Sequence, residues 1–166
     1  MDGALWRMIE GDAVPLDHVL ARYCKACEVI NGEVQGPAFM LTQGHDYLSV
    51  TSLNDVAPDR PQPEQVGAAR SAVVASGFTP KKSGWFVLIR ADVVARPLTD
   101  DGSGARLVLE TLCHPEPGNA SHCGIHGLPP LGSPQATSVG LEVAGRVTEP
   151  VYSAGTLVAT PARRLT

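Results

Sequence analysis

The stretch Trp85-Phe86-Val87-Leu88-Ile89-Arg90 joins five large apolar residues in a chain of 166 residues. A short, continuous apolar run of this kind is typical of a buried central strand. In residues 105–112, apolar residues also stand at consecutive or alternating positions, so we expect both segments to lie in one sheet. The polar residues 99–104 between them predict a flexible connection, long enough for a loose hairpin.

Other short segments outward from this run also have the pattern of strands. Asn31-Gly32 stands between Val29-Ile30 and Glu33-Val34, and this dipeptide tolerates the positive backbone angles of a type I′ hairpin turn. Residues 118–133 are rich in Gly and Pro, which predicts an ordered loop. The further strands that we expect are residues 4–9, 38–41, 47–51, 139–147 and 151–159.

Two segments have helical spacing. Leu16, Val19, Leu20 and Tyr23 recur at intervals of three and four, which predicts a helix over residues 15–26. A second helix is expected over residues 64–76, after the proline-rich break at residues 57–63. The whole chain, residues 1–166, is therefore predicted to be a single α+β domain with a largely antiparallel mixed sheet and two main helices.

Composition restricts the function classes. The chain has 43% hydrophobic residues and a net charge of −4, which disfavours a surface that neutralises the phosphates of nucleic acid. No window is apolar enough for a membrane span, and Met1-Asp2-Gly3 begins no export segment. We therefore expect a cytoplasmic protein without a membrane or nucleic-acid partner. In that compartment the four cysteines are expected to be thiols.

The spacing of Cys and His residues suggests a metal site. Cys24-x-x-Cys27 and Cys123-x-x-His126 each repeat the two-residue gap of zinc-ligand pairs. Together they predict a closed Cys3His site for a structural zinc ion, provided that the two segments meet in space. The alternative interpretation is that Cys24 and Cys27 are small residues packed on a helix.

Cys113 and His114 are alternative ligands for the same ion. Neighbouring side chains in a strand point to opposite faces, so at most one of these two could reach it.

Two further arrangements could carry chemistry. Cys123 could act as a thiolate nucleophile with His122 or His126 as its base. Alternatively, His18, Arg70 and His122 could form an acid–base or anion-binding set in which the planar guanidinium holds a phosphate or carboxylate. The ordinary alternative for Arg70 is an exposed position on the helix.

Several short motifs resemble a group of small uncharacterised bacterial proteins. The resemblance spans residues 6–129, and the group's positions match this chain at His18, Ser49, Arg70 and His122. Members of the group usually have a small residue such as alanine where this chain has Cys123. The motifs that carry the resemblance are Asp17-His18-Val19, Ala38-Phe39, Leu48-Ser49-Val50, Arg70, Phe86-Val87-Leu88-Ile89, His114-Pro115 and Ser121-His122.

The resemblance implies an accessory role, because the group has no assigned activity and often lies near bacterial conflict or defence genes. We therefore expect a non-enzymatic accessory subunit that binds a protein partner in a bacterial, defence-type system, with the structural zinc described above. The alternative is an enzyme that acts on a nucleotide or another phosphorylated small molecule through His18, Arg70 and His122.

Overall fold

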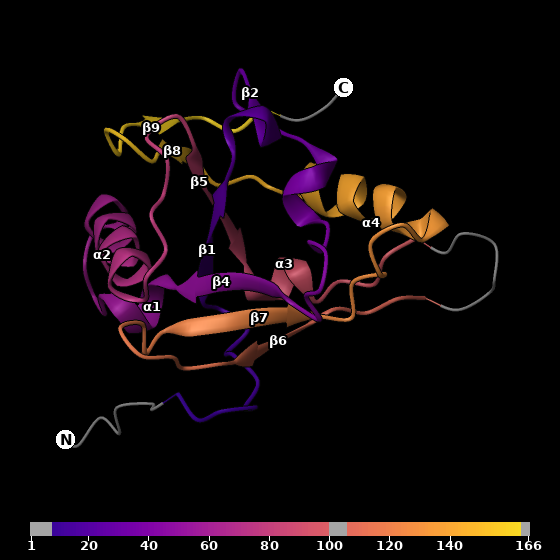
Figure 1. The fold of residues 1–166 in the computed structure, drawn as a ribbon, viewed down its shortest axis with the longest axis horizontal. Coiled ribbons are helices and arrows are strands. Elements are labelled where there is room, and N and C mark those ends of the chain that lie inside the picture. The colour runs from indigo at the N-terminus through magenta and orange to yellow at the C-terminus, as the bar shows by residue number, and fades with distance from the viewer. Residues whose placement is uncertain (1–7, 100–105, 164–166) are drawn as a thin grey trace.

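Seven strands form one antiparallel sheet in the computed structural model, which describes residues 8–99 and 106–163. Their order across the sheet, written by position in the chain, is sixth, seventh, fourth, first, fifth, eighth, ninth (Figure 1). The strands are β1 (Val19–Cys24), β4 (Leu48–Ser52), β5 (Trp85–Arg90), β6 (Glu110–Cys113), β7 (His122–His126), β8 (Val151–Ser153) and β9 (Ala159–Thr160).

The other elements connect and cover this sheet. A separate hairpin is made by β2 (Val29–Ile30) and β3 (Glu33–Val34). No helix in the described part of the chain is long and apolar enough to cross a membrane. The helices are η1 (Ala26–Glu28), η2 (Gly36–Phe39), α1 (Leu53–Val56), α2 (Gln62–Ala75), α3 (Ala91–Val94) and α4 (Pro134–Gly145), of which η1 and η2 are 3-10 helices.

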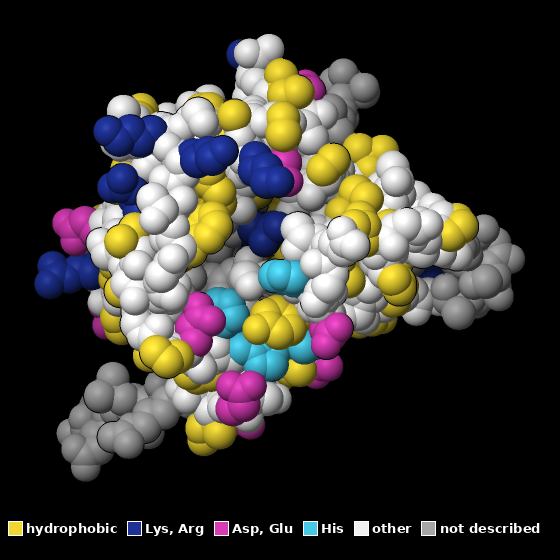
Figure 2. All heavy atoms as spheres, in the orientation of Figure 1, with side chains coloured by type: hydrophobic (Ala, Val, Ile, Leu, Met, Phe, Trp, Pro, Cys, Tyr) yellow, Lys and Arg dark blue, Asp and Glu magenta, His cyan; other side chains and the backbone are white. Residues whose placement is uncertain are grey.

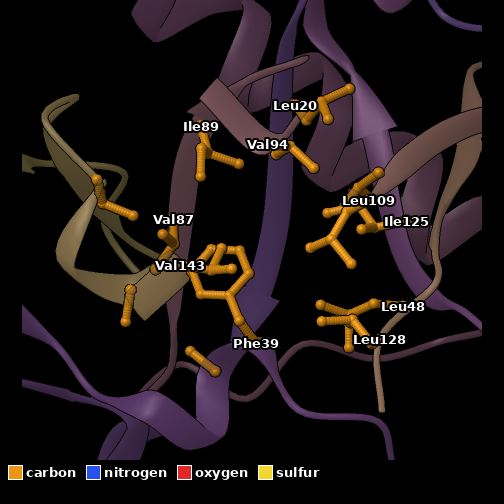
Figure 3. Close-up of a cluster of buried hydrophobic side chains, with 14 of the residues drawn as sticks. Leu20, Phe39, Leu48, Val87, Ile89, Val94, Leu109, Ile125, Leu128 and Val143 are labelled. Carbon is orange, nitrogen blue, oxygen red and sulfur yellow. The ribbon is translucent and has the colours of Figure 1, made fainter. Parts of the chain in front are cut away.

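The larger core lies on one face of the sheet, where η2 and α4 pack. Phe39 of η2 and Val143 of α4 are buried there with Val87 of β5 (Figure 3). Gly140 lets α4 approach η2 closely, because a Cβ at this position would lie 2.7 Å from the carbonyl oxygen of Gly36. The two helices therefore pack closely against each other on this face.

The opposite face is only partly covered by a helix. Val66 and Ala69 of α2 are buried against Phe86 and Leu88 of β5. Since successive strand residues point to opposite faces, β4 presents Ser49 and Thr51 on this side, while its Leu48 and Val50 enter the larger core. The polar positions of β4 are thereby available to a site beside α2.

The sheet bends at the junction between β1 and β4. All six residues of β1 pair with β5, whereas only Leu20 and Ala21 pair with β4. In Figure 1, β4 and β7 run across the view while β1 and β5 stand nearly upright. The two parts of the sheet therefore diverge where Arg22 follows the last paired residue.

Several predictions from sequence are confirmed. The α+β class, the antiparallel sheet and two longer helices are present. Asn31 and Gly32 have φ angles of 52° and 80° and join β2 to β3 as the hairpin turn requires. The segments expected at residues 47–51, 64–76 and 85–90 correspond to β4, α2 and β5.

The helix expected over residues 15–26 is wrong, because this segment forms β1. Leu16, which belonged to the supposed apolar face, is 60% exposed. The side chains that are buried deepest, Leu20 and Cys24, lie four residues apart, a spacing that a helix and a strand share. Six consecutive pairs with β5 decide for the strand.

The loop predicted over residues 118–133 and the strand predicted over residues 139–147 are also wrong. Residues 122–126 form β7 between β6 and β4, not part of a loop. Residues 139–147, expected as a strand, mostly belong to α4, whose Pro134 stands in the first turn. Buried Val139, Val143 and Ala144 have helical spacing there.

The remaining segments differ in smaller ways. Residues 38–41 were expected as a strand, but residues 38 and 39 close η2, whose Pro37 favours a tight turn. The strand expected at residues 105–112 is reduced to β6, which pairs with β7 and not with β5. Residues 151–159 form β8 and the start of β9. Of the segments expected at residues 4–9 and 99–104, residues 4–7 and 100–104 lie outside the described part of the chain, and residues 8 and 9 are not in a strand.

Candidate functional site

A cavity of about 460 Å³ opens on the partly covered face of the sheet, beside the C-terminal end of α2. Its floor includes Ser49 and Thr51 of β4 and His122 of β7, and its wall includes Val73 and Phe78. Figure 2 shows this face: Lys and Arg side chains gather above the central hollow, and His and acidic side chains gather below it. The cavity therefore has one basic side and one side rich in imidazole and carboxylate.

Arg22 supplies a half-buried positive charge to this cavity. Its Nε donates to the carbonyl oxygen of Ala38 at 2.6 Å, and its Nη1 donates to that of Ser49 at 3.1 Å. The side chain therefore fills the space where β1 and β4 diverge. Burial lowers the pKa of Arg22 below its ordinary 12.5, while nearby Cys24 and Glu28 act in the opposite direction.

The charge of Arg22 lacks a direct counterion in the described residues. No carboxylate in residues 8–99 or 106–163 forms an ion pair with it. The nearby Glu28 accepts a hydrogen bond from the backbone N–H of Lys25 at 2.7 Å. A guanidinium remains protonated in proteins, so Arg22 is a fixed cation with backbone carbonyls as its partners.

His122 lies on the same face, held by the neighbouring strand. It pairs across β4 and β7 with Thr51, and only 6% of its surface is exposed. Its Nδ1 lies 2.7 Å from the carbonyl oxygen of His114, and a carboxylate oxygen of Glu116 lies 3.8 Å from the same nitrogen. Both contacts fix the orientation of the ring.

A buried amide and hydroxyl network adjoins His122. Asn119 Nδ2 donates to Thr51 Oγ1 at 3.0 Å, and Asn119 Oδ1 accepts from the backbone N–H of Ser121 at 3.2 Å. These bonds tie the loop before β7 to β4. They hold the rim of the cavity in a defined position.

Gly124 makes room for a group of rings next to the cavity. A Cβ at this position would lie 2.5 Å from Tyr47 and 2.9 Å from His114. The rings of Tyr47 and His114 stack there with centroids 4.5 Å apart. His114 Nε2 also lies 2.6 Å from His126 Nε2, and His114 Nδ1 lies 2.7 Å from a carboxylate oxygen of Glu10.

The predicted set of His18, Arg70 and His122 is not assembled at this cavity, since only His122 lines it. His18 instead contacts Ser52 Oγ at 3.1 Å and Asp55 Oδ2 at 3.2 Å, both through Nδ1. A Ser-His-Asp relay needs the two ring nitrogens to have different partners, and Ser52 is fully buried. Ser52 and Asp55 therefore approach the same ring nitrogen, and a fully buried serine is not placed to attack a substrate.

Arg70 lies on α2 and is partly buried, not exposed. Its Nε is buried and makes no hydrogen bond within the described part of the chain. The anion-binding role that the sequence suggested for this arginine fits Arg22 better, because Arg22 lines the cavity.

The four predicted zinc ligands do not form a cluster. No group of three or more His, Cys, Asp or Glu side chains in residues 8–99 and 106–163 is arranged to hold a metal ion. Cys24 and Cys123 lie in the larger core on strands separated by β4, and Cys27 is exposed on η1. In a strand, residues three apart point to opposite faces, so Cys123 and His126 of β7 do not share a ligand direction.

The alternative ligands Cys113 and His114 are placed no better for a metal. Cys113 is fully buried opposite Cys123, and His114 points to the other face of the sheet, where it contacts Tyr47.

Cys123 is a packing residue in this structure. It is fully buried in the larger core, and its Sγ contacts the carbonyl oxygen of Ser121 at 3.4 Å. Burial raises the pKa of this thiol, which disfavours the thiolate that nucleophilic chemistry requires. The arrangement gives no support to a thiol enzyme centred on Cys123.

The fold and the cavity together define a single-domain α+β protein with a polar site on one face of an antiparallel sheet. No family model, curated protein or solved structure matches the chain. The resemblance to small bacterial proteins therefore stays a prediction, as do the accessory role and the protein partner that it implies.

Sequence reasoning found His122 but missed Arg22, Tyr47, Glu116 and Asn119. A signal for Arg22 was available, because this residue stands between the apolar Leu20 and Cys24 on alternating positions. A charged residue at an inward position of a strand indicates a special environment. The signal was lost when the segment was interpreted as a helix.

Proposed function

We propose that the protein binds a small ligand through a carboxylate or phosphate group, and that Arg22 is the residue that receives this group. The proposal rests on one observation: a half-buried guanidinium lines an open cavity, and its described partners are two backbone carbonyls. Removing a cation from water is costly unless it is paired. A bound anion supplies the missing counterion.

The rest of the cavity suits the body of a small organic molecule. Val73 and Phe78 form an apolar wall, and Tyr23 packs against Phe78 with ring centroids 5.3 Å apart. Apolar walls with a few placed polar groups are typical of ligand pockets, as is a volume of several hundred cubic ångströms. We expect an apolar or aromatic body with one anionic end.

The proposal agrees in substance with the alternative function derived from sequence, an Arg and His site for a phosphorylated small molecule, with Arg22 in place of Arg70. The proposal concerns binding; any reaction of the bound ligand would depend on His122. Binding itself is the function that the geometry of the cavity supports best.

The test is a binding measurement with 3-phenylpropionate and phenyl phosphate, each compared with the neutral 3-phenylpropanol at constant ionic strength. We expect saturable binding of an anion in titration calorimetry and little binding of the alcohol. Arg22→Gln should weaken anion binding at least about tenfold, because a charge-assisted hydrogen bond contributes about 1.5–3 kcal/mol. The matched control is Arg60→Gln, since Arg60 is 67% exposed at the surface.

A second variant keeps Arg22 intact in case Arg22→Gln does not fold. Val73→Trp places a large side chain in the cavity from the α2 wall and should also abolish binding. Equal affinity for the anions and the alcohol would contradict the proposal. Unchanged anion affinity in a folded Arg22→Gln or Val73→Trp variant would contradict it as well.

A further inference from the structure

We infer that the ligand also carries a hydroxyl or amino group, and that His122 Nε2 accepts a hydrogen bond from it, which makes His122 the residue that decides specificity. This inference rests on the proposed function, because it describes a second contact of the same ligand. It follows from the tautomer of His122, from its position relative to Arg22 and from the access that the cavity gives to its ring.

The tautomer of His122 is set by its backbone partner. The carbonyl oxygen of His114, 2.7 Å from Nδ1, can only accept a hydrogen bond. Nδ1 must therefore carry the proton, and in the neutral ring Nε2 has a lone pair. The neighbouring carboxylate of Glu116, 3.8 Å from Nδ1, favours the same protonated Nδ1.

The structure records no hydrogen bond of Nε2 with residues 8–99 or 106–163. Within the described residues, His122 contacts its neighbours through Nδ1 and through the edge of its ring, which faces Tyr47 with centroids 6.0 Å apart. The residue is almost fully buried and lines the cavity. Nε2 does not belong to the buried polar atoms that lack a hydrogen bond, so this nitrogen is accessible from the cavity, where a ligand with an O–H or N–H group can reach it.

The sheet also fixes the spacing of the two contacts. Arg22 Nη1 is bound to the carbonyl of Ser49, whereas His122 lies opposite Thr51, two residues further along β4 and one strand across. Two residues along a strand and one strand spacing correspond to about 8 Å. This is the backbone separation of Ser49 and His122, so the inferred ligand is an anion that carries a hydroxyl or amino group at the far end of an apolar body of about this length.

Three ligands that differ at one position test this inference: 3-(4-hydroxyphenyl)propionate, 3-phenylpropionate and 3-(4-methoxyphenyl)propionate. All three have the same carboxylate and ring, but only the first can donate a hydrogen bond from the far end. We expect the wild-type protein to bind the phenol about tenfold more tightly than the other two.

The preference should depend on His122. His122→Phe keeps a planar ring without a nitrogen and should reduce the affinity ratio to about one. His122→Gln, whose amide oxygen can reach the position of Nε2, should restore part of the preference. The readout is a ratio of two affinities measured on one variant, so partial unfolding lowers both values and leaves the ratio unchanged.

The outcomes separate this inference from the proposed function. Equal, Arg22-dependent binding of all three ligands would overturn the inference and leave the anion site intact. A preference for the phenol that persists in His122→Phe would overturn it too. If none of the three ligands binds, both proposals are wrong.

Discussion

At the scale of single residues, the four cysteines have different environments despite their paired spacing. Cys24, Cys113 and Cys123 are buried, and Cys27 is exposed. Burial raises the pKa of Cys24 to about 12 and that of Cys113 to about 11. A thiol that is buried and protonated reacts slowly, because the thiolate is the nucleophile.

We predict that iodoacetamide alkylates the native protein at Cys27 alone, at about pH 8, near the ordinary range of thiol pKa values. Cys24 should react on the time scale of global unfolding and become accessible in denaturant. Mass spectrometry of digested protein, sampled over time, gives both rates. Modification of Cys24 as fast as that of Cys27 would show that the strand position of Cys24 is wrong.

His126 provides a prediction about pH. Burial lowers the pKa of His126 below its ordinary 6.5, and the nearby His114 acts in the same direction. The unfolded chain therefore binds the proton more readily than the folded one, so the free energy of unfolding falls as the pH drops below 6.5. His126→Gln removes this proton uptake and should give a flatter dependence.

The measurement is urea unfolding of both proteins at a series of pH values from about 7.5 downward, across the ordinary range of histidine. Above that range the difference between wild type and variant should be constant. Identical slopes in the two proteins below it would contradict the assignment.

At the scale of elements, Gly118 joins the loop before β7 to the end of α2. Its φ angle is +84°, and a Cβ there would lie 2.3 Å from the carbonyl oxygen of Ala75. Gly118→Ala must therefore move this loop away from α2, and the Asn119 side chain with it. We expect a loss of roughly 1–3 kcal/mol in unfolding free energy.

Gly145→Ala is the matched control for this prediction. Gly145 ends α4, and a Cβ there meets no atom within 4 Å. We expect this variant to be as stable as the wild type or more stable by up to about 1 kcal/mol. Thermal unfolding of both variants gives the comparison, and equal midpoints for the two would contradict the packing of the loop on α2.

The elements that sequence reasoning could find are those in which a local signal and the tertiary structure agree. Residues 85–89 are apolar on consecutive positions because β5 is buried on both faces, and Asn31-Gly32 has the backbone freedom that the hairpin turn needs. β1 and α4 were harder to predict from the sequence. The spacing of Leu20 and Cys24 suits both kinds of element, and the valines of α4 favour strands by themselves. Pairing with β5 and packing on η2, which decide these cases, involve residues far apart in the sequence.

The candidate site follows the same rule. His122 was recognisable because three histidines occur close together in the sequence, but the partner of its Nδ1 is a backbone carbonyl, which no residue type reveals. The four residues predicted to bind zinc lie apart in the structure for a related reason. The two-residue gap between Cys123 and His126 brings ligands together in a turn, whereas β7 directs them to opposite faces.

At the scale of the whole molecule, the sheet consists of two parts joined at β1 and β4. One part contains β6, β7 and β4, and the other contains β1, β5, β8 and β9. Only Leu20 and Ala21 pair across the junction. On either side of these residues, Arg22 of β1 donates a hydrogen bond to the carbonyl oxygen of Ser49 in β4, and the backbone N–H of Val19 donates to Asn54, which follows β4.

We predict that hydrogen exchange distinguishes the two parts. Amides of β1 and β5, which pair along their full length, should exchange more slowly than those of β6 and β7. Arg22→Ala should increase the exchange of the second group more than that of the first. Exchange measured by mass spectrometry on peptides from each part tests this, and a uniform increase throughout the sheet would contradict it.

The two roles of Arg22, one in the structure and one in the proposed ligand site, have a consequence for how this protein can evolve. A residue that binds a ligand commonly lowers the stability of the fold, so a substitution at such a position can raise stability at the expense of binding. Here the same guanidinium closes a break in the backbone ladder and faces the cavity. Replacing this arginine would therefore not stabilise a homologue that no longer binds the ligand. We expect the arginine to be retained even in homologues whose cavity binds nothing.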